Sequence, residues 1–70
     1  MITLEELQNR FTYHAPKGDQ AERYGRIRNS ALTLAILISN LTPESREQDI
    51  ALTLLEEAVM MANAAIARRE

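Results

Sequence analysis

The sequence predicts an all-α fold in which a short N-terminal helix precedes two long antiparallel helices, and this helical hairpin assembles into a homo-oligomer. Helix-start motifs occur three times, and apolar residues recur at steps of three and four along two long segments. Only a short loop separates these segments, which makes them antiparallel neighbours. A chain of 70 residues is enough for a single domain, residues 1–70.

The first helix is expected over residues 4–10. Thr3 and Glu6 have the spacing of a capping box, in which the threonine hydroxyl accepts a hydrogen bond from an early helix N–H. Pro16 then disfavours a helical conformation at the residue before it, and Gly18 suits a turn. The chain between the first and second helices is therefore predicted to be a connection.

The second helix is expected over about residues 20–41. Asp19 and Glu22 repeat the capping-box spacing at its start. Its apolar residues fall on one face, and they are Tyr24, Ile27, Ala31, Leu34, Ile38 and Leu41. We expect Phe11 to pack under the start of this helix with Tyr24 and Ile27, as a hydrophobic staple does.

The third helix is expected to follow a loop at Pro43, with a third capping box at Ser45 and Gln48, and to end at about Arg68. It carries two apolar stripes. The first comprises Ala51, Leu54, Ala58, Met61 and Ala65, and the second comprises Leu52, Leu55, Val59, Ala62 and Ile66. One stripe can pack on the second helix, and the other is left for a partner, which Ala58, Ala62 and Ala65 would allow to approach closely.

Oligomerisation is the expected source of stability. A chain this short buries a modest share of its surface, and it has no cysteine and one histidine with which to add disulfides or a metal cluster. No apolar run approaches the roughly 20 residues of a membrane span, so no membrane partner is expected. The absence of cysteine and of an export signal favours a cytoplasmic location.

The charge distribution favours a compact anion over long nucleic acid as ligand. The net charge is −2, yet residues 10–28 hold five basic and two acidic groups, a local balance of +3. Overall basicity drives the binding of long nucleic acid, and the remaining residues carry −5. The chain lacks the common nucleophile–base pairs and phosphate loops, so we expect no enzyme activity, no cofactor and no metal.

Two side chains on residues 10–28 stand out as ligand contacts. Tyr13 lies beside His14 and Lys17, and an exposed aromatic ring near cations suits a nucleobase, which stacks on it. Arg28 follows the apolar Ile27, at the edge of the buried stripe, where its planar fork of donors matches phosphate. Arg23 and Arg26 are interpreted as a solvated helix face.

Three further residues have simpler explanations from chemistry alone. The Ser30 hydroxyl can bond phosphate or a backbone carbonyl of its own helix. Arg68 and Arg69 at the end of the third helix complement its dipole without any ligand.

The segments RFTYHAPKGDQAERYGRIR, TPESREQDIALTLLEEAV and MMANAAIARRE together resemble the phage anti-CBASS cyclic-nucleotide sponge family, whose hairpin domain is shared with the sponges that counter Thoeris defence. The resemblance covers the chain from about Arg10 to Glu70. It implies a compact helical homohexamer that binds cyclic oligonucleotides without cleaving them, and so evades host immunity by depriving its effectors of their messenger.

The resemblance implies a pocket for cyclic dinucleotides, such as cyclic GMP-AMP, between protomers. Tyr13 matches the aromatic residue that stacks on a base, and Arg28 matches the cation that meets phosphate. Phe11 and His14 flank Tyr13 and are candidate contacts of the same ligand. The family cation is typically lysine, so Arg28 keeps the charge and changes the reach and geometry.

The resemblance also implies a second pocket, for cyclic trinucleotides, around a symmetry axis. Ser30 and Arg69 match its hydroxyl and its cation, and Arg68 takes the place of Arg69 if the register differs by one residue. The expected location is the cytoplasm of the infected host.

Two other functions remain open from the residues. A helical protein-interaction or structural module would use the unpaired stripe of the third helix to grip a host protein. A small DNA-binding regulator would use the second helix, and the acidic remainder and lack of a helix-turn-helix pattern count against it.

Overall fold

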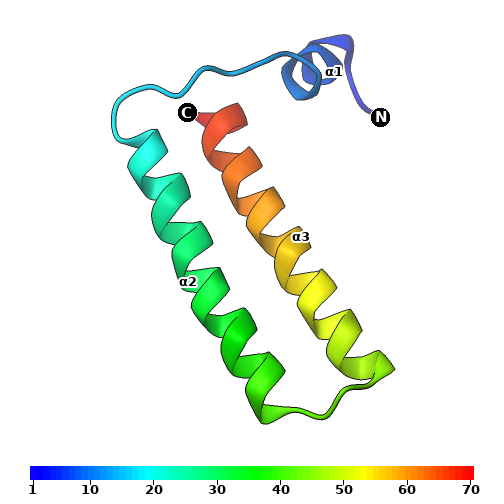
Figure 1. Cartoon of the computed structure of the whole chain (residues 1–70). Coiled ribbons are helices and arrows are strands. Elements are labelled where there is room, and N and C mark those ends of the chain that lie inside the picture. The colour runs from blue at the N-terminus through cyan, green and yellow to red at the C-terminus, as the bar shows by residue number, and fades with distance from the viewer.

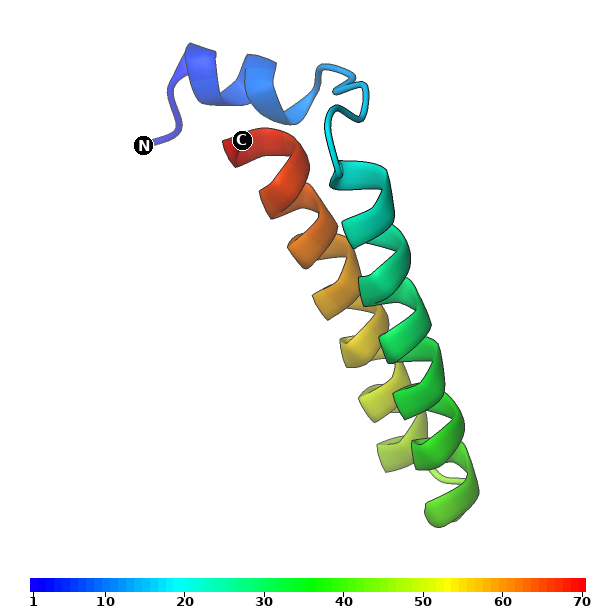
Figure 2. The same cartoon turned by 90° about the vertical axis from the view of Figure 1, so that its left-hand side faces the viewer.

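The computed structural model describes residues 1–70 and contains three helices and no strand. They are α1 (Leu4–Arg10), α2 (Gln20–Leu41) and α3 (Arg46–Arg69). In Figure 1, α2 and α3 run antiparallel side by side, while α1 lies beyond the open end of the hairpin. Figure 2 shows α1 crossing above the C-terminal end of α3. The predicted all-α architecture and the bounds of the first two helices are confirmed.

Two of the three predicted helix caps are present. The backbone N–H of Glu6 donates to Thr3 Oγ1 at 3.1 Å, and that of Gln48 donates to Ser45 Oγ at 3.1 Å. Each hydroxyl satisfies one N–H that a helix start leaves without a partner inside the helix.

The predicted cap at Asp19 is wrong. Asp19 precedes α2, but its side chain caps no helix N–H, and its φ of −91° and ψ of 12° are not the extended conformation typical of a cap. The carboxylate instead accepts a hydrogen bond from Arg23 Nε at 3.1 Å, one turn into the helix. Gly18, at φ 57°, forms the turn before it, as glycine readily adopts that conformation.

The turn between α2 and α3 is tied by the side chain of Gln48. Its Nε2 lies within 3.0 Å of both the carbonyl and hydroxyl oxygens of Thr42, and 3.2 Å from the carbonyl oxygen of Ser39. In a complete capping box the Gln48 side chain would bond back to the N–H of Ser45. Here it bonds to the end of α2 instead. One side chain of α3 thus ties the end of α2 to the start of α3.

The hairpin is a thin layer without a closed hydrophobic core. Its extents are 44 × 31 × 13 Å, and its radius of gyration of 15.2 Å exceeds the value of about 11 Å for a compact domain of this length. The single buried residue is the polar Gln20, and no hydrophobic residue is buried. A lone chain therefore gains little of the apolar burial that stabilises folded proteins.

The two stripes of α3 have different surroundings. α3 packs on α2, and the members of its second stripe are half-buried. These members are Leu52, Leu55, Val59, Ala62 and Ile66. Most of the first stripe is exposed, including Leu54, Ala58, Met61 and Ala65. Of the three alanines expected to admit a partner, Ala62 therefore lies in the stripe that faces α2. Only Ala58 and Ala65 belong to the exposed stripe.

The expectation that Phe11 helps to close the apolar face is wrong. Tyr24 and Ile27 are half-buried as predicted, but Phe11 is 85% exposed. Phe11 follows α1 as its C-cap, and its N–H donates to Leu7 O. Because α1 lies beyond the open end of the hairpin (Figure 1), the residue that caps it stays exposed and does not pack under the start of α2.

The expectation that no segment has membrane-span character is also corrected. α3 is long and apolar enough to cross a membrane, judged by its length and composition only. None of its most apolar stretch is buried within the chain. Its alanines and long aliphatic residues make α3 apolar on average, although Glu56 and Glu57 add two charges near its middle.

Candidate functional site

A hollow of about 350 Å³ at the open end of the hairpin brings together residues from the connecting segment and both long helices. We call it the Tyr13 hollow. It is lined by Arg10, Thr12, Tyr13, His14, Tyr24, Arg28, Met60, Asn63, Ala64, Ala67 and Arg68. Tyr13, His14 and Arg28, which the sequence singled out, therefore lie around one space. Phe11 does not line it.

The connecting segment holds Tyr13 through its neighbour. His14 is half-buried, and its Nε2 lies 2.7 Å from the carbonyl oxygen of Asn9 near the end of α1. A carbonyl oxygen only accepts hydrogen bonds, so Nε2 carries the proton and donates it. Tyr13 itself is 83% exposed. The structure thus anchors the histidine and presents the tyrosine ring to solvent.

The electrostatic character of the hollow is cationic. Three arginines line it, Arg10, Arg28 and Arg68, and no acidic residue does. Arg10 Nε lies 3.8 Å from a carboxylate oxygen of Glu6, whereas Arg28 makes no salt bridge in the chain. Arg28 is therefore exposed and available to a phosphate, whose geometry its fork of donors matches.

Ser30 and Arg69 do not share a space within one chain. Ser30 lines a hollow of about 540 Å³ with Arg23, Arg26, Ile27 and Ile66. Arg68 and Arg69 line a different hollow, of about 480 Å³, with residues of α1 and its cap, which are Thr3, Glu5, Glu6 and Asn9. A site that uses both Ser30 and Arg69 therefore needs more than one protomer.

In the free chain α1 neutralises Arg69. The guanidinium donates two hydrogen bonds to the Glu6 carboxylate, Nη1 to Oε1 at 2.7 Å and Nη2 to Oε2 at 3.1 Å. The hydrogen bonds from Arg69 are the main reason that the pKa of Glu6 is lowered, and the same bonds raise the pKa of Arg69. Asn9 Nδ2 also donates to the carbonyl oxygen of Arg68 at 3.2 Å, which holds α1 on the end of α3.

Arg23 forms a second clamp at the same end, contrary to its interpretation as a solvated cation. Its Nη1 donates to Glu70 Oε2 at 2.7 Å, and Gln20 Nε2 donates to Glu70 Oε1 at 3.1 Å. The hydrogen bonds from Arg23, followed by that from Gln20, lower the pKa of Glu70 to about 2. Gln20 is buried, and its Oε1 also accepts a hydrogen bond from the Lys17 N–H at 3.1 Å.

Acid should release this clamp. The pKa of Glu70 is lowered from 4.5 to about 2, so its contribution to stability is complete above pH 4.5 and is lost as the pH falls toward 2. We expect Glu70→Gln to lower the melting temperature at neutral pH and to show a smaller further fall across this acid range than the parent. Circular dichroism melts at a series of pH values measure both.

The control for this experiment is Glu44→Gln. Glu44 is exposed in the turn and makes no salt bridge. This variant should follow the acid profile of the parent. Identical profiles for Glu70→Gln and the parent would contradict the assigned role of the clamp.

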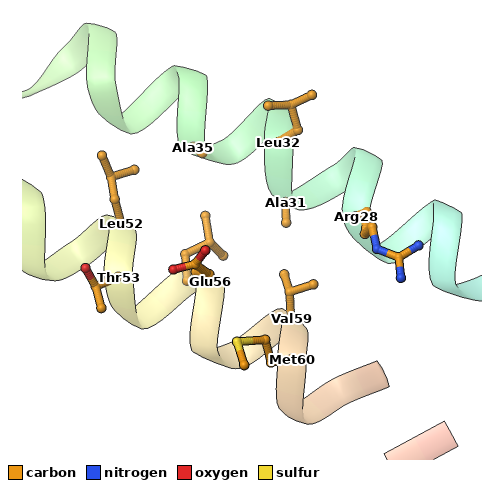
Figure 3. Close-up of a pocket in the computed structure, with 10 residues that line it drawn as sticks. Arg28, Ala31, Leu32, Ala35, Leu52, Thr53, Glu56, Val59 and Met60 are labelled. Carbon is orange, nitrogen blue, oxygen red and sulfur yellow. The ribbon is translucent and has the colours of Figure 1, made fainter. Parts of the chain in front are cut away.

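Two apolar grooves cover the faces of the hairpin. One, of about 590 Å³, is lined by Ala31, Leu32 and Ala35 of α2 and by Leu52, Leu55 and Val59 of α3, among others. Figure 3 shows Arg28 at one end of this groove, beyond Ala31. The other, of about 310 Å³, has Leu34, Ala58 and Ala62 among its lining residues. Arg28 therefore borders both an apolar groove and the Tyr13 hollow.

Sequence reasoning missed several polar or aromatic members of the hollow, including Thr12. Arg10 and Tyr24 were not linked to Tyr13, and Asn63 was not considered at all. Asn63 is half-buried, and its Oδ1 is enclosed without a hydrogen-bond partner. The signal for it in the sequence is a single amide inside the apolar run MMANAAIA.

Comparison with known proteins agrees with this architecture. Residues 4–67 match the family model described as Acb2/Tad1, hairpin domain. No curated protein and no solved structure matches the chain. The matched range includes α1, α2, most of α3 and every residue around the Tyr13 hollow except Arg68. The chain therefore belongs to the Acb2/Tad1 hairpin family of anti-CBASS and anti-Thoeris sponges, which is consistent with a role as a cyclic-nucleotide sponge.

Proposed function

We propose that this protein is a homo-oligomeric sponge that binds cyclic oligonucleotides in the host cytoplasm, holds them intact and so prevents activation of CBASS effectors. The observation that carries the proposal is the composition of the Tyr13 hollow. An exposed tyrosine and three arginines line it, without an acidic residue to repel an anion. These are the groups that a ligand made of bases and phosphates requires.

A cyclic dinucleotide such as cyclic GMP-AMP fits this chemistry best. Its base stacks on Tyr13 and its phosphate meets Arg28. Stacking of one base on an aromatic ring contributes roughly 1–3 kcal/mol, and charge-assisted hydrogen bonds to phosphate add to it. Nanomolar affinity corresponds to about −12 kcal/mol, so a single hollow with one ring falls short of it. A second copy of the same groups on the other half of the ligand makes up the difference.

The absence of a closed core supports assembly from several copies. No hydrophobic residue is buried in the single chain, although both faces of the hairpin carry apolar grooves. Burial of these grooves against other copies would supply the missing stabilisation. At a two-fold interface, two copies of Tyr13 and Arg28 would meet the two halves of one ligand. The family resemblance favours a hexamer.

A cyclic trinucleotide would use Ser30 and Arg69, with Arg68 beside them, from several protomers around an axis. Glu6 already occupies the donors of Arg69. A phosphate must therefore displace this carboxylate, or the assembly must move α1 away. Because this displacement costs free energy, we expect the trinucleotide site to bind its ligand more weakly than the Tyr13 hollow does, for the same number of phosphate contacts.

Sequestration needs no catalytic group, which agrees with the surroundings of His14. Its Nε2 is committed to the carbonyl oxygen of Asn9 and is not directed as a free base toward a ligand. The protein should therefore bind stoichiometrically and release the compound unchanged.

The test is calorimetric titration of the purified protein with cyclic GMP-AMP and with cyclic tri-adenylate, followed by recovery of the ligand. We expect tight, saturable binding of cyclic GMP-AMP and full recovery of the intact compound by mass spectrometry. No heat with either compound would overturn the proposal. Recovery of a linear or shortened product would make the protein an enzyme.

A second candidate function rests on the exposed stripe of α3. A helical module that grips a host protein would use Leu54, Ala58, Met61 and Ala65, which nothing covers in the chain. The same helix is less suited to lipid, because Glu56 and Glu57 lie near its middle and a charged side chain there costs about 2.5–3.5 kcal/mol on insertion scales. A monomer that binds no cyclic nucleotide would favour this alternative.

A further inference from the structure

Asn63 is the one side chain with an enclosed polar atom that accepts no hydrogen bond from the protein. It lies on α3, and its Oδ1 is buried without a protein donor. Most buried polar groups are hydrogen-bonded, and an orphaned acceptor lowers stability. Such an atom in a binding hollow is typical of a group kept for a ligand.

Asn63 lies beside the space that a ligand would fill, and its Oδ1, which is closed to solvent in the free chain, must turn toward that space to meet a ligand. It lines the Tyr13 hollow with Tyr13 and Arg28. Its neighbours along α3 in that lining, Ala64 and Ala67, have small apolar side chains that cannot donate to it. Tyr13 is strongly exposed while Asn63 is half-buried, so the ring lies nearer the solvent and the amide deeper in the hollow.

We propose that Asn63 reads the edge of the base that stacks on Tyr13 and that it selects adenine, an inference that rests on the proposed function. Its carboxamide offers one acceptor and two donors. Adenine offers an amino donor beside the N7 acceptor, and asparagine pairs with these two groups through two parallel hydrogen bonds. Guanine has O6 in place of that amino group, so the same edge presents two acceptors and leaves Oδ1 without a donor.

The proposal predicts opposite changes in stability and binding. Asn63→Leu removes the orphaned acceptor and keeps a side chain of similar size. The melting temperature of the ligand-free protein should stay the same or rise, because no hydrogen bond within the protein is lost. Binding of cyclic di-adenylate should weaken by about fivefold or more for each adenine, from the loss of a paired base edge. A purely structural asparagine would show the reverse pattern.

The experiment titrates the full-length parent, Asn63→Leu and the control Asn40→Leu with cyclic di-adenylate and with cyclic di-guanylate. Melting temperature and sedimentation coefficient are measured on the same samples. Asn40 is an exposed amide at the far end of α2, and its variant should bind as the parent does. We expect only Asn63→Leu to lose affinity, and to lose it mainly for cyclic di-adenylate. Should this variant not fold, Asn63→Asp keeps the shape and removes the amide donors, with the same expected loss.

The outcomes separate this inference from the proposed function. A parent that binds neither compound would overturn this inference, and the proposed function falls with it only when cyclic GMP-AMP and cyclic tri-adenylate also give no heat. If Asn63→Leu binds cyclic di-adenylate as tightly as the parent does, the role of Asn63 is overturned and the proposed function is not. Loss confined to cyclic di-guanylate would overturn the choice of adenine. Dissociation of the assembly in Asn63→Leu would show that a second chain satisfies Oδ1, which would also overturn the inference.

Discussion

Tyr13→Ala should weaken the binding of cyclic GMP-AMP by at least about thirtyfold and leave the mass of the assembly unchanged. Each base stacked on the ring contributes roughly 1–3 kcal/mol, and two symmetry-related copies of Tyr13 would hold the two bases of one ligand. Because the ring is 83% exposed, its removal takes little packing from the folded chain. Calorimetric titration gives the affinity, and sedimentation velocity gives the mass.

Phe11→Ala is a closely matched control. Phe11 lies two residues from Tyr13 and is similarly exposed, at 85%, but it does not line the hollow. Its variant should retain the affinity of the parent. An equal loss of affinity in both variants would mean that Phe11 and Tyr13 contribute together to ligand binding. Dissociation of Tyr13→Ala into monomers would mean that the ring holds the assembly together rather than the ligand.

The helices could be predicted from local sequence, and the end of the hairpin could not. Thr3 and Ser45 act as caps because a cap depends only on residues within one turn. Asp19 has the same spacing but follows the turn at Gly18, which places its backbone outside the conformation that a cap needs. Local spacing alone cannot distinguish the two situations.

The position of α1 depends on contacts that no local pattern contains. Glu6 pairs with Arg69 across 63 residues, and Arg23 pairs with Glu70 across 47. Sequence reasoning treated these arginines as a helix-dipole partner or as solvated, which is the usual state of charges near a helix end. With α1 lying over the end of α3 (Figure 2), Phe11, which caps α1, is 85% exposed.

The candidate site was predicted in part. Tyr13, His14 and Arg28 lie on nearby segments of the chain, and the start of α2 brings them to one hollow. Asn63 and Arg68 enter the same hollow from α3, so their proximity follows from the antiparallel packing of the hairpin. Ser30 and Arg69 stay apart in one chain, and whether they meet depends on how protomers cross, which side-chain periodicity does not determine.

The exposed stripe of α3 leads to the second prediction with a large effect, that Ala58→Glu prevents assembly. Ala58 is a small, exposed residue in the middle of this stripe and lines an apolar groove. A partner helix packed there would bury the new carboxylate without a counter-charge, which costs several kcal/mol. Because the single chain buries no hydrophobic residue, dissociation should also reduce its helical content and melting temperature.

Sedimentation velocity and circular dichroism measure these two effects, with Asn40→Glu as a control that adds the same charge at an exposed polar position of α2. An unchanged sedimentation coefficient for Ala58→Glu would exclude this stripe as the interface between copies. Ala62→Glu is a poorer test, because Ala62 lies in the stripe that packs on α2. A carboxylate there would separate the two helices of one chain, and the loss of assembly would follow from the loss of the hairpin itself. The choice between the two alanines therefore depends on which stripe faces α2. The pattern of apolar residues leaves this open, and the packing of the hairpin decides it.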